Sequence, residues 1–102
     1  MSEIINLYDI EYGEKYNKKL VFDNQNSSLT LISFKSGTER ALHVDEQDEV
    51  AQIIEGKAEV TIGKDKFVLK ANEMIVMPAK TPHGLKAIED TKMLLLRPKH
   101  VH

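Results

Sequence analysis

Short apolar segments separated by turn-forming residues make up most of the chain, and several of them alternate polar with apolar positions. Residues 28–34 (SLTLISF) are rich in β-branched and aromatic side chains, and the turn-forming residues KSGT follow them. Residues 56–63 (GKAEVTIG) alternate polar and apolar side chains between two glycines. A period of two residues is typical of a strand that buries one face. The pattern therefore predicts strands in both segments.

The same combination of apolar segment and turn recurs along the rest of the chain. It predicts further strands in RALHV, EVAQIIE, KFVLK, EMIVM, HGLKAI and KMLLLRP, at residues 40–44, 49–55, 66–70, 73–77, 83–88 and 92–98. One segment, residues 10–18 (IEYGEKYNK), has a helical character that its glycine weakens. Many short strands at close spacing predict an all-β fold, a sandwich or a barrel.

The length of 102 residues is enough for one domain with one core. We expect the barrel in residues 28–98, followed by a tail in residues 99–102. Residues 1–27 contain the apolar stretch IINLYDI, which is expected to supply edge strands that pack on the barrel or on a dimer partner. The protein is therefore predicted to be a homodimer.

Composition excludes several classes of function. Lysine and arginine number 14 against 16 aspartates and glutamates, so a net charge of −2 gives no electrostatic basis for binding nucleic acid or an anionic membrane. No apolar run approaches the roughly 18 residues that a membrane span needs, and the N-terminus lacks the pattern of a secretory signal. The absence of cysteine excludes disulfides and thiolate ligands. We expect a cytoplasmic protein whose partners are small molecules.

Two histidines and a group of carboxylates stand out as candidates for chemistry. His43 and Asp45 are two residues apart in a predicted strand and its extension, so their side chains are expected to face the same side. Glu49 opens the next strand, and His83 follows a loop bounded by prolines. Two imidazoles with one or two carboxylates suit a borderline divalent ion, such as manganese, iron, nickel, cobalt or zinc.

The spacing around the first histidine matches a known motif. Gly37 is followed after five residues by His43, then Asp45, then after three residues Glu49, and after six more Gly56. The first motif of the cupins has this spacing, with a second histidine at the position of Asp45. In this respect the sequence resembles the cupin superfamily.

A second match lies near the C-terminus. Pro78 and His83 stand at the spacing of the second cupin motif, whereas Asn72, Lys80 and Ala87 replace its two glycines and its final asparagine. Agreement across two separate motifs is more specific than either half alone. The resemblance covers Ser28 to Pro98, most of the chain.

The resemblance implies a double-stranded β-helix, the jelly-roll barrel of the cupins. It also implies that His43, Asp45, Glu49 and His83 correspond to the metal ligands of the family. Aspartate is shorter and harder than the usual histidine, so Asp45 is left open as a direct ligand, a ligand through water, or no ligand. As a direct ligand it would favour harder, oxygen-preferring ions.

Other side chains near the proposed site have more than one interpretation. Arg97, on the last strand, either forms a salt bridge or holds a substrate carboxylate as a bidentate pair. Arg40 precedes His43 by three residues on one strand and is expected on the opposite side, exposed. Side chains in phase with the proposed ligands predict an aliphatic pocket wall: Ala51, Ile53, Leu85 and Ala87.

Three functions follow from these observations. The first is a small metal-binding cupin that acts on an oxygen-rich molecule, a sugar or carboxylate, as an isomerase, a lyase or a dioxygenase. The second is a ligand-binding or regulatory cupin without turnover. The third is an oxygenase whose His-x-Asp and distal histidine form a facial triad assisted by Arg97, and it ranks below the others because Glu49 fits the cupin set better.

Overall fold

The computed structural model describes residues 2–99 and contains nine strands and no helix in that part of the chain. The strands are β1 (Tyr16–Asp23), β2 (Ser27–Phe34), β3 (Glu39–His43), β4 (Glu49–Glu55), β5 (Lys57–Ile62), β6 (Asp65–Lys70), β7 (Met74–Met77), β8 (His83–Ala87) and β9 (Thr91–Pro98). The predicted all-β fold is confirmed. The helical interpretation of residues 10–18 is wrong, because β1 begins inside that segment.

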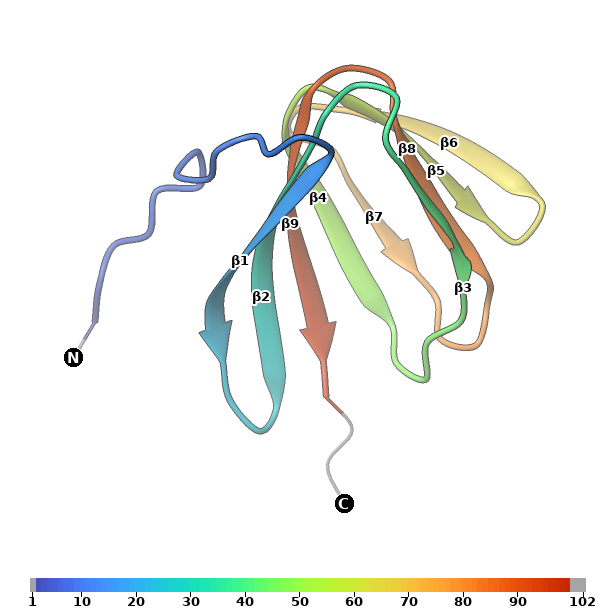
Figure 1. The fold of residues 1–102 in the computed structure, drawn as a ribbon. Coiled ribbons are helices and arrows are strands. Elements are labelled where there is room, and N and C mark those ends of the chain that lie inside the picture. The colour runs from blue at the N-terminus through green and yellow to red at the C-terminus, as the bar shows by residue number, and fades with distance from the viewer. Residues whose placement is uncertain (1, 100–102) are drawn as a thin grey trace.

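Two antiparallel sheets face each other and enclose the core (Figure 1). One sheet has the strand order β1-β2-β9-β4-β7, and the other has the order β3-β8-β5-β6. From β2 to β5 and again from β6 to β9, successive strands alternate between the sheets in the manner of a jelly roll, and β9 lies between β2 and β4. Strands β3 and β9 end, and β4 and β8 begin, at the lower end of Figure 1. This arrangement gathers four strand termini at one mouth of the barrel.

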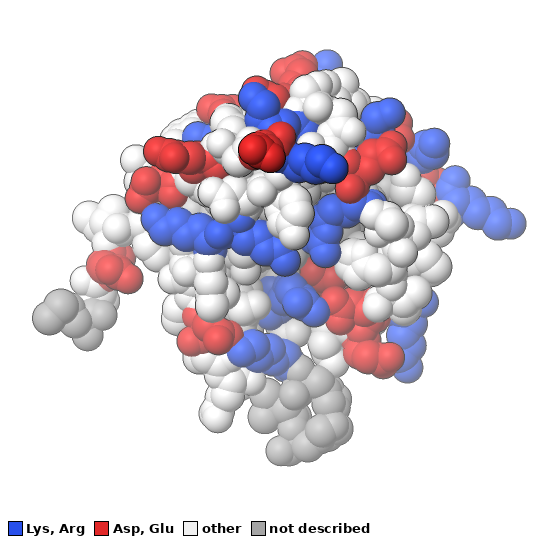
Figure 2. Space-filling view, viewed as in Figure 1, with Lys and Arg blue, Asp and Glu red and all other residues white. Residues whose placement is uncertain are grey.

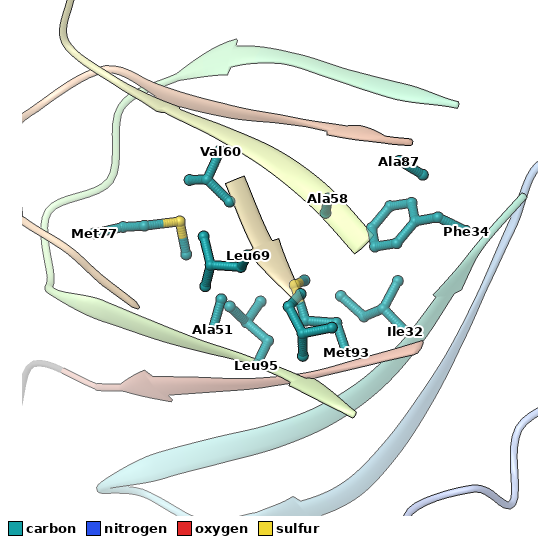
Figure 3. Packing of buried hydrophobic residues seen from close by; sticks show 11 residues of the cluster. Ile32, Phe34, Ala51, Ala58, Val60, Leu69, Met77, Ala87, Met93 and Leu95 are labelled. Atoms are coloured by element: carbon teal, nitrogen blue, oxygen red, sulfur yellow. The ribbon is translucent and has the colours of Figure 1, made fainter. Parts of the chain in front are cut away.

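The alternation seen in the sequence corresponds to burial between the sheets. On β5, Ala58 and Val60 are fully buried, and on β9 Met93 and Leu95 are almost so. Together with side chains of the facing strands they form one apolar cluster (Figure 3). Burial of such side chains contributes about 1.5–3 kcal/mol each for the larger ones. The core therefore fixes the relative position of the two sheets and of the strand ends at the mouth.

A β-bulge interrupts the pairing of β3 with β8. Arg40 pairs with Leu85, and His43 pairs with His83, so three steps along β3 match two steps along β8. The extra residue returns Arg40 to the face that carries His43. Arg40 is only half exposed and lines the same cavities as His43. The prediction that Arg40 lies on the opposite, exposed side is therefore wrong.

The N-terminal segment packs on the outer face of the five-stranded sheet. Ile10 is buried there against Leu31 and Ile54. The Tyr12 hydroxyl donates a 2.6 Å hydrogen bond to the Glu55 carboxylate. Burial and this hydrogen bond raise the pKa of Tyr12 above its ordinary value of 10.0. Before Ile10, Tyr8 and Asp9 still contact Lys92 and Lys19, and the chain before them runs to the side of β1 (Figure 1).

The remaining surface carries both signs of charge. Acidic and basic side chains are interspersed over the face shown in Figure 2. No helix in the described chain is long and apolar enough to cross a membrane. Of the predicted tail at residues 99–102, only Lys99 belongs to the part that the structure describes, and its amide donates to the Asn26 carbonyl.

Candidate metal centre

Three side chains converge at the mouth of the barrel. His43 is the last residue of β3, Glu49 the first of β4 and His83 the first of β8. Nε2 of His83 lies 3.1 Å from Oε1 of Glu49, and Nε2 of His43 lies 3.9 Å from the same oxygen. The two imidazole rings are 4.3 Å apart between centroids. One donor atom from each residue lies within 4.8 Å of the other two, a spacing suited to a single ion.

The three residues differ in exposure. The side chains of His83 and Glu49 are 3% and 4% exposed, whereas that of His43 is 38% exposed. The cluster is therefore sealed toward the core and open on the side of His43. A site with one open side leaves room for a small molecule next to the cluster.

The hydrogen bonds of His83 favour one tautomer. Its Nδ1 lies 3.1 Å from the Thr81 carbonyl oxygen, which can only accept, so Nδ1 carries the proton. In the neutral ring Nε2 then presents a lone pair toward Glu49, whose carboxylate oxygen is also an acceptor. Two acceptors at 3.1 Å require a positive charge between them, which is a proton or a metal cation. The donor set therefore fits a metal, and the Thr81 carbonyl orients the imidazole for it.

The carboxyl of Glu49 holds a proton more tightly than an ordinary glutamate does, because its pKa is raised. Burial raises the pKa of its carboxyl, and the nearby Asp45 carboxyl raises it further, which outweighs the opposite effects of Arg97 and His83. The folded protein thus binds this proton more tightly than the unfolded chain does. Ionised Glu49 costs stability in the metal-free protein at neutral pH, and the cost disappears as the pH falls through the raised pKa toward 4.5.

Replacement of Glu49 by glutamine should raise the melting temperature of the metal-free protein at neutral pH, because it removes a buried negative charge. The same variant should lose its stabilisation by metal. Melts with and without metal, at neutral and acidic pH, measure both effects, and the difference from wild type should vanish in acid. Glu59→Gln, on a half-exposed side chain of the other sheet, is the control and should change neither. A metal-free Glu49→Gln protein that melts lower than wild type at neutral pH contradicts this prediction.

Asp45 and Arg97 form an ion pair beside the cluster. Nη2 of Arg97 lies 2.7 Å from Oδ2 of Asp45, and its Nε lies 3.5 Å from Oε2 of Glu49. Partial burial opposes ionisation of Asp45, but the Glu49 carboxyl and the Arg97 charge outweigh it, so the pKa of Asp45 lies below its usual value. Asp45 is not one of the three clustered ligands, and its carboxylate faces the guanidinium instead. The guanidinium of Arg97 is therefore paired with carboxylates of the protein itself.

Two cavities adjoin the cluster and share Arg40, His43 and Glu49 in their walls. The outer one has a volume of about 190 Å³ and is lined by polar side chains together with Ile32 and Leu95. The inner one is about 20 Å³ and has apolar walls that include Leu85. The other three residues predicted for the wall are buried in the core between the sheets: Ala51, Ile53 and Ala87. The aliphatic lining thus comes mainly from residues that sequence reasoning missed, namely Met77, Met93 and Leu95.

A jelly-roll barrel of two sheets with histidine and glutamate side chains converging at its mouth defines a class of small β-barrel proteins with a candidate metal centre. Comparison with family models identifies the class, since the model of the cupin domain matches residues 30–97. The chain belongs to the cupin superfamily. The predicted resemblance is confirmed.

Solved structures share the fold over nearly the whole chain. A conserved protein of unknown function from Streptococcus pyogenes superposes with a TM-score of 0.89 at 27% identity, covering 100% of this chain and 91% of that one. A cupin superfamily protein from Desulfitobacterium hafniense gives a TM-score of 0.87 at 20% identity, covering 92% and 87%. An uncharacterised protein from Methanocaldococcus jannaschii is 27% identical over 77 residues, which are 74% of this chain. The matched part is 62% of the length of that relative.

Proposed function

We propose that this protein binds one divalent metal ion through His43, Glu49 and His83 and presents it to a small oxygen-rich molecule in the outer cavity. The observation that carries the proposal is the convergence of three donor atoms within 4.8 Å. Manganese, iron, nickel, cobalt and zinc all accept such a set of two imidazoles and a carboxylate. A bound ion of this kind supplies Lewis acidity toward a carbonyl or hydroxyl oxygen.

The residues around the cluster have distinct parts in this proposal. The Thr81 carbonyl holds the His83 ring so that Nε2 faces the cluster. Glu49 supplies a negative charge that is shielded from water. His43 borders the outer cavity, so the molecule bound there approaches the centre from its side. The apolar inner cavity keeps bulk water away from the buried side of the centre.

Elemental analysis of protein purified without a histidine tag tests the proposal directly. About one equivalent of a transition metal per chain is expected after purification or after loading with a single metal and dialysis. The tag is omitted because its imidazoles would bind metal themselves. Protein that retains no metal after loading with each of the five ions would overturn the proposal.

Asp45→Ala should weaken metal binding about tenfold to a hundredfold without abolishing it, the usual effect of a residue that orients a ligand. Loss of the ion pair frees Arg97 to approach Glu49, whose carboxylate the metal needs. Competition titration with a chelator measures the affinity. Glu46→Ala, an exposed acidic residue of the same turn, should leave it unchanged. An Asp45→Ala loss as complete as that of His83→Ala would instead make Asp45 a ligand.

We further propose that the protein is a homodimer that covers the outer face of the five-stranded sheet. A row of apolar side chains crosses all five strands on that face in register: Phe22, Leu29, Leu96, Val50 and Val76. Apolar side chains of the N-terminal segment are also exposed, among them Ile4 and Tyr8. Contiguous apolar surface of this kind is typical of protein–protein contacts.

Light scattering should therefore give a mass of about twice 11.6 kDa at micromolar concentration. Val76→Glu should shift the protein toward the monomer, because it places a charge in the apolar row. Val68→Glu is the matched control, since Val68 is similarly exposed but lies on β6 of the other sheet. A wild-type mass near 11.6 kDa, or equal effects of the two substitutions, would contradict the proposed dimer.

A further inference from the structure

Arg40 is placed at the centre of the proposed site by the bulge in β3. Its pairing partner Leu85 is itself paired with Val60, a fully buried residue of the core, so Arg40 lies on the inner face of its sheet. It lines both the outer and the inner cavity together with His43 and Glu49. A guanidinium therefore borders the same space as the candidate metal centre.

Arg40 has no carboxylate partner among residues 2–99, where every ion pair of the cavity involves Arg97 or a histidine. A half-buried guanidinium loses part of its hydration, and without an anion nothing in the protein compensates that loss. Arg97 contrasts with it, because Asp45 and Glu49 already neutralise that side chain. Arg40 is thus the arginine of the cavity that is free to bind an external anion.

Lys18 adds a second cation from the opposite sheet. It pairs with Ile32, whose side chain belongs to the core, so Lys18 also lies on an inner face, and it lines the outer cavity. Within the described part of the chain it has no ion-pair partner either. The two carboxylates of the cavity are engaged by Arg97 and by the histidine cluster. The charge that the cavity offers to a ligand is therefore positive.

We propose that Arg40, assisted by Lys18, is an anion subsite that selects a carboxylate-bearing molecule and aligns it with the metal centre. This inference rests on the proposed function, since the same molecule places an oxygen at that centre. The planar guanidinium matches a carboxylate through two parallel hydrogen bonds. The outer cavity, about 190 Å³, is smaller than the roughly 300–1,000 Å³ of sites for drug-sized ligands. The ligand class is therefore a small carboxylate of a few carbons with a second oxygen group, rather than a nucleotide or an oligosaccharide.

Calorimetric titration with succinate and with succinamide tests the subsite. The two probes have the same carbon skeleton, but succinamide carries neutral amides in place of both carboxylates, so only succinate offers an anion to Arg40. With manganese-loaded protein, succinate should bind about tenfold or more tightly than succinamide, the value of one charge-assisted hydrogen-bonded pair. Arg40→Gln should weaken succinate binding about tenfold and reduce the preference by the same factor, and Lys18→Gln should have a smaller effect in the same direction.

Controls separate this inference from the proposed function. Arg40→Gln should retain one metal equivalent per chain, and Lys86→Gln, on an exposed residue paired with Glu39 outside these cavities, should bind succinate as wild type does. Equal affinities for the two probes, an unchanged affinity in Arg40→Gln, or no binding at millimolar succinate would overturn the anion subsite while metal binding stands. If the protein binds no metal, the proposed function fails. Succinate binding by wild type and by Arg40→Gln is then measured in the metal-free protein, where the same results would support or overturn the anion subsite.

Discussion

His83→Ala is expected to abolish most of the proposed metal binding and with it the rise in melting temperature that metal should cause. His43→Ala has the same expected result, since each histidine supplies one of three clustered donors. An ion that binds only the folded state stabilises it by about 2.7 kcal/mol when free metal is 100-fold above its dissociation constant. For a domain of this size each kcal/mol corresponds to about 4–8 °C. The wild type should therefore melt about 10 °C or more higher with metal, and both variants should show almost no shift.

Thermal melts with and without manganese, iron(II), nickel and zinc measure this effect. Each variant is compared with itself, so the stability that the substitution alone costs does not enter the comparison. Leu42→Ala shortens an exposed neighbour of His43 on β3 and should keep the full metal shift. Lowering the pH should remove the shift in wild type, because the ligands bind metal only when deprotonated. Equal shifts in wild type and in both histidine variants would mean that the cluster binds no metal.

Gly56→Ala is expected to destabilise the protein by about 2–5 kcal/mol. Gly56 has a φ of +92°, and a side chain in the left-handed region costs about 1–2 kcal/mol. A Cβ at this position would also overlap the Asp90 carbonyl oxygen and lie 2.8 Å from the Thr91 Cα. Relief of that overlap must move backbone in the turn before β9, and strain of this kind costs typically 1–3 kcal/mol.

Gly37→Ala is a matched control for this effect. Gly37 has a similar φ of +88°, but nothing lies within 4 Å of the position where its Cβ would stand. Gly37→Ala should therefore lower the free energy of unfolding only by the cost of a side chain in the left-handed region, about 1–2 kcal/mol. Denaturant unfolding of both variants gives the difference between them. Equal losses would show that the close approach to the Asp90–Thr91 turn has no energetic consequence.

Much of the barrel could be predicted because strands and turns are indicated by residues that are close together in the sequence. Alternation in residues 56–63 corresponds to the burial of Ala58 and Val60, and turn residues mark the ends of most strands. Three of the four proposed ligands meet because the motif spacing follows strand ends: His43 closes β3, and Glu49 and His83 open β4 and β8. Spacing predicts these positions because β3 and β8 pair through His43 and His83, and the short loop after β3 starts β4 at the same mouth of the barrel.

The missed features depend on backbone detail or on contacts between distant segments. The same-side argument for Asp45 needed the strand to continue, but β3 ends at His43. Asp45 turns instead toward Arg97, which is 52 positions away along the chain. The side of the sheet on which Arg40 lies was predicted wrongly because a bulge adds one residue between Arg40 and His43. The extra residue puts both side chains on the same face, and no glycine or proline in RALHV indicates the bulge. Side chains such as Met77 and Met93 enter the cavity wall only through the packing of the two sheets.

The position of β9 between β2 and β4 determines when the protein can fold during synthesis. A nascent chain that ends before Thr91 has β2 and β4 already made, but without the strand that hydrogen-bonds to both. The edges of β2 and β4 that face β9 stay unpaired until Pro98 has been made, 28 positions after the end of β6, whereas β5 and β6 can already form their local hairpin. Pairing across such sequence distances is slow in β proteins. The newly made chain is thus exposed to aggregation and to chaperones for longer than a helical protein of equal length.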